Sequence, residues 1–316
     1  MAALGEPEIF QNALKLYDEG KFKEGYTLIT EHAAEYPDYM QQSFYFRLCL
    51  IAKSGDLTMA EEILEDALDQ GYFFSEFALV KDEDLQALQG RGFYEKLVLR
   101  DLQMLNEAQK NSKPMLQIIH PVHEPHNEAM RFLMALHGNN SNLKRFLPRW
   151  DFISRADWLT AVPQSSQVGG SELFVWNDQA IAQREIKAHY QTVLKHYTPD
   201  PAMSLICGFS MGGNTALKAA LEQAFPISAF LLICPFFGDI DAWMPLIEAS
   251  ANKGLRGYFL LGKLDEPDTT NSKTMQKLLE DHGISCGVEV FEGIRHDFPP
   301  DFEQVFERVT RTLFPG

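Results

Sequence analysis

Several features common in membrane-spanning, secreted and nucleic-acid-binding proteins are missing from this sequence of 316 residues. The longest apolar run, over 229–237, is interrupted by Pro235 and is far shorter than the roughly 20 residues that a membrane-spanning helix needs. No basic segment followed by an apolar one stands at the start, so we expect no secretory signal. Basic residues are scarce, with 28 Lys and Arg against 44 Asp and Glu, and the net charge of −16 disfavours nucleic acids and anionic bilayers as partners.

Cysteine is scarce as well, and its spacing matches neither a disulfide framework nor a zinc site. The cysteines lie far apart inside apolar runs, with no CxxC pair and no Cys/His ligand spacing. Residues of this kind are usually buried free thiols, which suit a reducing compartment, so we expect a cytoplasmic protein. The cysteines are Cys49, Cys207, Cys234 and Cys286.

Neither a phosphate-binding loop nor a recognisable metal motif is present in the sequence. Gly169 and Gly170 stand alone in a polar stretch, without the glycine pattern that cradles phosphates. His120, His123 and His126 do not have an established ligand spacing, and no carboxylate cluster accompanies them. We therefore expect no metal and no cofactor.

Residues 1–112 have the periodicity of amphipathic helices, with apolar positions at i, i+3 and i+4 and few β-branched runs. Two helix–turn–helix units break at Gly20 and Gly55 and are offset by about 35 residues. Because each unit alone cannot bury its apolar face, the units should stack into a helical-repeat domain over 1–112. The units resemble tetratricopeptide repeats at Gly20, Tyr26, Pro37, Gly55 and Ala60. The expected helices cover 8–16, 22–34, 41–52, 57–68, 81–88 and 93–109.

The helical region carries most of the excess negative charge. Up to residue 112 the chain has 10 basic and 21 acidic residues, whereas the remainder has 18 and 23. Acidic helices of this kind usually form a solvated surface that keeps a protein soluble. The alternative is a docking face for a basic protein partner or a surface for self-association.

From residue 113 onward, strand-like apolar runs alternate with helical stretches. This pattern predicts an α/β domain over 113–316, with a mostly parallel sheet flanked by helices. The segments 115–121 and 130–136 enclose a turn-like sequence, which predicts an antiparallel hairpin. In a parallel sheet, ligands bind beyond the carboxyl ends of the strands, so we expect the chemistry in the loops that follow them. Further strands are expected over 158–162, 203–207, 229–234, 257–261 and 287–291, and helices over 179–196, 212–224, 271–282 and 301–313.

The sequence GFSMGG, residues 208–213, lies directly between an expected strand and an expected helix. A serine at a tight strand-to-helix turn needs small residues two positions away on either side, because larger side chains would clash there. The motif therefore predicts that Ser210 is a nucleophile. Its position between strand and helix makes the prediction much more specific than the five letters G-x-S-x-G alone.

A serine hydroxyl is a poor nucleophile at neutral pH and needs a base, which is itself oriented by a third group. His296 lies in the loop after the last expected strand and is the predicted base, whereas His282 has the position of a helix C-cap. Asp265 lies in the loop after the preceding expected strand and is the predicted orienting acid. The alternative acids are Glu266, Asp268 and Asp239.

Acyl transfer also requires hydrogen-bond donors for the oxyanion that forms on the attacked carbonyl. The backbone N–H of Met211, at the start of a helix, should provide one of them. The second should be the backbone N–H of Asn139, because Gly138 lets the chain approach the substrate closely. We interpret His137 as a packed, hydrogen-bonded loop residue rather than a proton carrier.

The chain resembles the α/β-hydrolase superfamily, and within it the phospholipase/carboxylesterase branch of esterases and acyl-thioesterases. The resemblance covers roughly residues 115–316 and rests on the segments LHGNNSN, PQSSQ, VWND, GFSMGG, LLGKLDEPD and GIRHDFPPDF. It implies an α/β-hydrolase fold with a catalytic triad and an oxyanion hole. The branch commonly has Gln where this chain has Met211. The missing side-chain amide leaves the substrate class open, but it does not affect the oxyanion hole, because the donor there is the backbone N–H. The residues placed in these roles are Ser210, Asp265, His296, Asn139 and Met211.

These residues predict a serine hydrolase that cleaves carboxylic esters, or thioesters, of small neutral acyl substrates through an acyl-enzyme. Trp176 and Asp178 are the expected substrate-binding residues, although a tryptophan in an apolar run can equally belong to the core. Trp243 and Met244 could wall the same site. Two alternatives remain: a peptidase of short peptides that uses the same triad, and a helical interaction module with a non-catalytic hydrolase scaffold.

Overall fold

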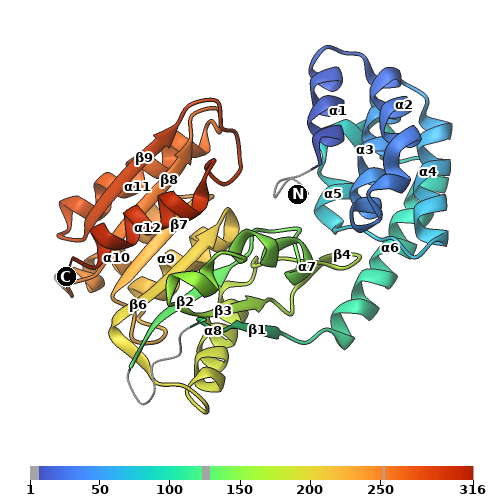
Figure 1. Cartoon of the computed structure of the whole chain (residues 1–316). Helices are drawn as coiled ribbons and strands as arrows, with labels where there is room; N and C mark the ends of the chain where they lie inside the picture. The colour runs from blue at the N-terminus through green and yellow to red at the C-terminus, as the bar shows by residue number, and fades with distance from the viewer. Residues whose placement is uncertain (1–6, 123–128, 252, 316) are drawn as a thin grey trace. The chain divides into compact units, whose positions relative to one another are not determined.

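The computed structural model describes residues 7–122, 129–251 and 253–315 (Figure 1). The chain divides into two compact units. A helical unit contains the described residues up to Ser112 together with Val168–Leu173, and a sheet unit contains Lys113–Gln167 and the described residues from Phe174 onward. The chain therefore leaves the sheet unit for one short segment and then returns to it.

The described part of the helical unit contains α1 (Glu8–Asp18), α2 (Phe22–His32), α3 (Met40–Lys53), α4 (Leu57–Asp69), α5 (Glu76–Val80) and α6 (Gly92–Asn111), with the 3-10 turns η1 (Ala33–Glu35), η2 (Pro37–Tyr39) and η3 (Glu83–Leu88). Each of the first three helices packs against the next, and α4 packs against α6. The apolar faces of α3 and α4 meet around the fully buried Leu48 and Leu64, whereas α1 and α2 share a smaller apolar cluster around Phe10 and Ile29. Gly20 after α1 and Gly55 after α3 have φ of 71° and 89°, a left-handed conformation that suits a residue without Cβ. The segment 81–88, predicted as a helix, contains η3 instead.

A two-stranded hairpin that the sequence does not predict belongs to the helical unit except for its last residue, Phe174. Its strands are β4 (Val168–Gly170) and β5 (Leu173–Phe174). The Oγ of Ser171 accepts the Phe73 N–H at 2.6 Å, and the Ser171 N–H donates to the Phe73 carbonyl at 3.0 Å. A Cβ built on Gly170 would meet the same carbonyl at 3.1 Å. The segment Val168–Leu173 is therefore tightly packed against the helices, although about 100 residues of sequence separate it from Phe73.

The strands of the main sheet are β1 (Met115–Ile119), β2 (Met130–Leu136), β3 (Leu159–Gln164), β6 (Pro199–Phe209), β7 (Ala229–Ile233), β8 (Arg256–Gly262) and β9 (Ser285–Phe291). Their order is β1-β3-β2-β6-β7-β8-β9, and every neighbouring pair is parallel except β1 with β3. The connections contain α7 (Leu143–Phe146), α8 (Gln179–Val193), α9 (Met211–Leu221), α10 (Met244–Ser250), α11 (Asp268–Asp281) and α12 (Phe302–Leu313), with η4 (Leu147–Trp150), η5 (Ile153–Ala156) and η6 (Asp241–Trp243). This is the mostly parallel sheet flanked by helices that the alternating pattern predicts (Figure 1).

Both faces of the sheet are covered, as a parallel sheet requires. The buried side chains of β7 alternate between two apolar clusters, with Phe230 and Leu232 in one and Leu231 and Ile233 in the other. The first cluster includes residues of α8, α9, α10 and α11, whereas the second includes residues of η4 and α12. The sheet is therefore a buried layer whose carboxyl edge carries the loops of interest.

The predicted antiparallel hairpin between 115–121 and 130–136 is wrong. β1 pairs with β3, where Ile118 lies opposite Ala161, and β2 lies between β3 and β6. Burial explains the difference: most of β2 is fully buried and belongs inside a sheet, whereas β1 is partly exposed, with Met115 54% exposed, and suits an edge. The expected turn at 123–127, and with it His123 and His126, lies outside the described residues.

All four cysteines are buried and free, as the sequence predicts. Within 7–122, 129–251 and 253–315, no helix combines the length and the apolar character that crossing a membrane requires.

Candidate active site

Ser210 occupies a strained turn at the carboxyl edge of the sheet. β6 ends at Phe209 and α9 begins at Met211, so Ser210 is the single residue between strand and helix. Its φ of 55° and ψ of −124° lie in a region that residues with a Cβ rarely adopt. The Ser210 N–H donates to the Ile233 carbonyl of β7 at 3.0 Å, and this bond helps to hold the turn. A strained serine between strand and helix has the geometry of a nucleophile elbow.

The glycines around Ser210 are required by close backbone packing. A Cβ on Gly208 would lie 2.1 Å from the Gly212 carbonyl oxygen, and a Cβ on Gly212 would lie 2.2 Å from the His137 carbonyl oxygen. Gly213 is less crowded, but a Cβ there would still come within 2.9 Å of the Pro235 side chain. None of these distances is possible for a real side chain, so the elbow can form only with glycine at the positions that the motif specifies.

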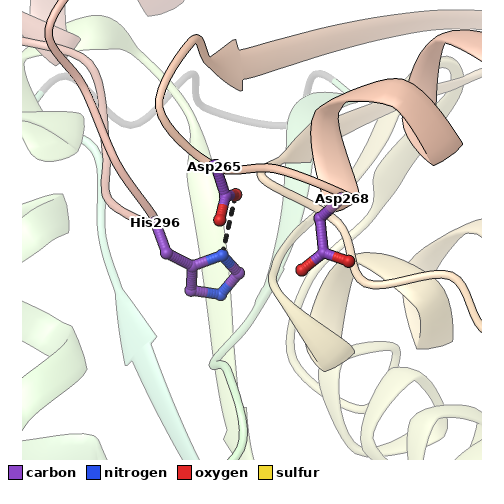
Figure 2. A group of neighbouring side chains, drawn as sticks. All are labelled: Asp265, Asp268 and His296. Carbon is purple, nitrogen blue, oxygen red and sulfur yellow. Dashed lines mark hydrogen bonds and ion pairs between the residues drawn. The ribbon is translucent and has the colours of Figure 1, made fainter.

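Asp265 and His296 are hydrogen-bonded to each other (Figure 2). Asp265 lies in the turn between β8 and α11, and His296 lies in the segment between β9 and α12. The Nδ1 of His296 donates to the Asp265 Oδ2 at 2.8 Å. This bond leaves Nε2 as the free nitrogen of the ring. The carboxylate is mostly buried and the imidazole is partly exposed, which suits an orienting acid and a base that must meet substrate.

Close backbone packing also places the segment that carries His296. A Cβ on Gly262, the last residue of β8, would lie 2.1 Å from the Arg295 carbonyl oxygen. The Leu264 N–H donates to the Ile294 carbonyl at 2.8 Å. The residues before His296 are therefore held against the end of β8, next to Asp265.

Phe209 links the serine turn to the histidine. Its ring lies 5.0 Å from the His296 ring and 5.1 Å from the Phe298 ring, measured between centroids. Because Phe209 directly precedes Ser210, this contact packs His296, which follows the edge strand β9, against the residue before the serine. Phe209 occupies a variable position of G-x-S-x-G, so the sequence gives no signal for this contact.

The alternative acids have other environments. Asp268, the first residue of α11, lies close enough to the pair that its carboxylate, that of Asp265 and a His296 ring nitrogen fall within 4.8 Å of one another (Figure 2). Burial, and then the charge of Asp265, raise the pKa of Asp268 above its usual value. Glu266 accepts the Thr270 N–H at 3.3 Å.

Two further alternatives from the sequence lie away from this pair. Asp239 is exposed and accepts the Asp241 N–H at 3.1 Å. His282 is the C-cap of α11 and donates Nδ1–H to the Leu278 carbonyl at 2.8 Å. Of the acids that the sequence offered, Asp265 is thus the one that the structure hydrogen-bonds to His296.

The loop after β2 approaches Ser210 as closely as its glycine allows. A Cβ on Gly138 would lie 2.8 Å from the Phe209 ring and 3.2 Å from the Ser210 Cβ. The next residue, Asn139, is tied to the chain after β5, because its Oδ1 accepts the Trp176 N–H at 2.8 Å and its Nδ2 donates to Asn177 at 2.7 Å. The backbone of Asn139 is therefore fixed beside the elbow, where the sequence predicts an oxyanion donor.

His137 is a buried, neutral residue that orients this loop. Burial lowers its pKa to about 4. Its Nδ1–H donates to the Gly138 carbonyl at 2.6 Å, and its Nε2 accepts the Ser165 N–H at 3.3 Å. In a planar trans peptide the carbonyl and the following N–H point in opposite directions. By holding the Gly138 carbonyl towards the interior, His137 turns the Asn139 N–H away from the interior.

Trp176 and Asp178, the expected substrate-binding residues, both form hydrogen bonds within the sheet unit. Trp176 is 0% exposed, packs in the core and donates its indole N–H to the His137 carbonyl at 2.8 Å. The Asp178 carboxylate caps α8 and accepts the N–H groups of Ala180 and Ile181 at 2.9 and 3.0 Å. The Trp176 ring therefore supports the loop around Gly138 from the core, and the exposed Asp178 caps α8.

A buried polar network next to this loop was missed by the sequence reasoning. Glu185 of α8 accepts the hydroxyl of Ser166 in a short hydrogen bond and the Ser166 N–H at 3.2 Å. Ser165, the neighbour of Ser166, donates its N–H to His137. The segment PQSSQ signals this network, but only the fold shows that its partners are on α8 and in the loop after β2.

Comparison with known proteins establishes the class of fold. Residues 6–109 match the family described as "A/B hydrolase-like, N-terminal domain". A solved structure of an uncharacterised protein from Bacillus cereus ATCC 10987 superimposes with a TM-score of 0.56 at 25% identity and covers 97% of each chain. Esterase PE8 superimposes with a TM-score of 0.53 at 19% identity over 64% of this chain and 99% of its own. The sheet unit has the α/β-hydrolase fold, and a helical region precedes it.

The sequence is also similar to that of a lipase. The monoglyceride lipase of Rattus norvegicus is 25% identical over 179 residues, which cover 54% of this chain and 58% of the lipase. The match thus spans less than two thirds of that enzyme.

Proposed function

We propose that the chain is a serine hydrolase that cleaves carboxylic esters, or thioesters, of small neutral acyl substrates. The observation that carries the proposal is the contact of Phe209 with His296, 5.0 Å between ring centroids, beside the strained Ser210. It joins a nucleophile elbow to a histidine whose Nδ1 is bonded to Asp265. The esterase and lipase among the similar proteins support the same reaction class.

In the proposed reaction, His296 removes the proton of Ser210 through Nε2 while Oγ attacks the acyl carbon. The carbonyl π electrons become the lone pair of the oxyanion. When the tetrahedral intermediate collapses, the bond to the leaving oxygen or sulfur breaks and His296 returns the proton to that atom. A water molecule, deprotonated by the same nitrogen, then attacks the acyl carbon. The bond from this carbon to Oγ breaks, the acid leaves, and His296 returns the proton to Ser210.

Asp265 and two backbone N–H groups stabilise the charges that develop. The Asp265 carboxylate keeps Nδ1 protonated and stabilises the imidazolium that forms opposite it. The N–H groups of Met211, at the start of α9, and Asn139, beside Gly138, would receive the oxyanion. Removal of a single donor of this kind typically lowers kcat by about 10²–10³-fold.

Exposed apolar side chains near these residues favour neutral acyl groups. Phe236 is 41% exposed, and its N–H donates to the Ser210 carbonyl at 3.2 Å. Leu264, which directly precedes Asp265, is 52% exposed. Large apolar side chains that remain in water next to a nucleophile gain free energy when an acyl chain covers them.

The test compares an acetyl ester, a butyryl ester, a monoacylglycerol, a thioester and a short peptide amide with the full chain. Ester turnover and fluorophosphonate labelling should both disappear in Ser210→Ala and persist in Ser228→Ala, a serine at the opposite end of β7. Labelling that survives in Ser210→Ala would refute the proposal. Amide turnover comparable to ester turnover would instead favour the peptidase alternative.

We further propose that the chain works in the cytoplasm and that the acidic helical unit is a surface for self-association or for a basic protein partner. The four free thiols suit a reducing compartment. Light scattering and a pull-down with the full chain, each at low and high salt, test the second point. Binding of a basic partner to the acidic helices should weaken as salt rises, whereas self-association of two acidic surfaces should strengthen, because salt screens their repulsion.

A further inference from the structure

Cys234, the residue directly after β7, combines burial with a strained backbone. It is 2% exposed, and its φ is 40°. In this left-handed region a Cβ is crowded by the backbone, and the conformation persists only where the surroundings hold it. Cys207 and Cys286 are also buried thiols, but they lie inside β6 and β9, where extended backbone is unstrained.

The thiol of Cys234 lies against the segment that carries His296. Its Sγ is 3.3 Å from the Asp297 carbonyl oxygen and 3.8 Å from the Arg295 carbonyl oxygen, so its single S–H proton can be shared between these two acceptors. These two carbonyls belong to the residues on either side of His296. A single side chain next to the end of β7 therefore contacts the backbone before and after the histidine.

The acid of the pair is a neighbour of the same thiol. Burial, and then the negative charge of Asp265, raise the pKa of Cys234 to about 12. The group therefore remains a neutral S–H donor at neutral pH. A protonated buried thiol is a poor nucleophile and a poor target for oxidation, so redox chemistry does not explain the strained position.

We propose that Cys234 is a positioning residue that keeps the imidazole of His296 on the Asp265 carboxylate by holding the carbonyls on both sides of the histidine. The inference rests on the proposed function, because the orientation of His296 limits a rate only if the ring transfers the Ser210 proton. β8 already restrains the residues before the histidine through Gly262 and Leu264. Cys234, which follows β7, adds a restraint that extends to Asp297, the residue after the histidine.

The size of the effect follows from the geometry that proton transfer demands. A displacement of about 1 Å at a reacting group can cost about 10²-fold in rate. Loss of one weak restraint among several should displace the ring by less, so we expect a loss in kcat of about tenfold. Substrate binding does not use this thiol, and KM should stay within about twofold of the original value.

The experiment compares Cys234→Ala, which removes the S–H donor, with Cys234→Ser, which keeps a hydrogen-bond donor on a shorter side chain. The matched control is Cys286→Ala, which removes a different buried thiol. Ester kcat and KM are measured together with the rate and the end point of fluorophosphonate labelling. We expect Cys234→Ala to lower kcat and the labelling rate by the same factor, with an unchanged end point. Cys234→Ser should recover most of the loss, and Cys286→Ala should match the original chain.

Cys234→Gly keeps the test valid if the alanine variant folds poorly, because glycine adopts φ near 40° without strain. It should show the same loss in kcat as alanine. The inference is overturned if kcat of Cys234→Ala or Cys234→Gly stays within twofold, or if Cys234→Ser loses as much as Cys234→Ala. It is also overturned if the labelled end point falls in proportion to kcat, which indicates fewer folded molecules. Absence of Ser210-dependent labelling in the unmodified chain would instead refute the proposed function.

Discussion

A methyl group added at Gly138 tests the oxyanion donor of the loop after β2. The new Cβ would lie 2.8 Å from the Phe209 ring, whereas carbon atoms pack best at about 3.5–4.0 Å, so the loop or the ring must move by about 1 Å. The ring has little freedom, because it packs against His296 and Phe298. Either movement damages the reaction: a shifted loop withdraws the Asn139 N–H, and a shifted ring disturbs His296.

We therefore expect Gly138→Ala to lower kcat by roughly 10- to 100-fold, or about 1.4–2.7 kcal/mol of transition-state stabilisation, because the donor is displaced rather than deleted. KM should change little. The control is Gly238→Ala, where a Cβ meets nothing within 4 Å and φ is not positive. Both variants are assayed with a chromogenic ester, and thermal melting checks the fold. A kcat within threefold of the original for a folded Gly138→Ala would refute this account of the loop.

Three further predictions follow from buried ionisable groups and from the proposed chemistry. The sheet unit should lose stability as pH falls from about 6.5 to 4, because burial lowers the pKa of His137 and of His189 to about 4, so that only the unfolded chain binds these protons. Each histidine changes the free energy of unfolding by at most about 1.4 kcal/mol per pH unit. In urea melts, the free energy of unfolding of His189→Leu should therefore depend less on pH than that of the original chain. An unchanged dependence on pH would contradict the lowered pKa of His189. Asp101→Asn should stabilise the helical unit at pH 8 by about 2–4 kcal/mol, because burial raises the pKa of the Asp101 carboxyl to about 7 and thus disfavours its charged form. The asparagine side chain carries no charge and can still accept the Phe74 N–H. A lower melting temperature for this variant would contradict the prediction. A chelator should leave ester turnover unchanged, although Asp265, Asp268 and His296 could together hold a metal ion, and a loss that divalent ions restore would contradict the triad.

The elbow could be predicted from the sequence because its requirements are local. Tight strand-to-helix turns exclude side chains at particular positions, and the distances at Gly208 and Gly212 show how strict that exclusion is. The loops of Asp265 and His296 could be predicted for a more general reason. The carboxyl ends of parallel strands meet at one edge, whatever the order of the strands in the sheet.

Strand partners could not be predicted in the same way. The sequence around β1 and β2 fits a hairpin as well as it fits an edge strand beside a buried one, and burial decides between them. Trp176 shows the same limit for single residues. An aromatic residue in an apolar run has the same pattern whether it lines a site or supports a loop from the core, as it does here. Cys234 gave no sequence signal beyond burial, because its role depends on a backbone angle and on two distant carbonyls.

The hairpin of β4 and β5 also constrains the order in which the polypeptide can mature during synthesis. The backbone groups of Phe73 find their partners on Ser171, 98 residues later in the chain. The helices can form as soon as they are made, but the hydrogen bonds between Phe73 and Ser171 cannot form until β1, β2 and β3 have also been translated. A ribosome that stalls before residue 168 therefore carries an unfinished helical unit, however complete its helices are, and a fragment that ends at residue 112 would remain in that state.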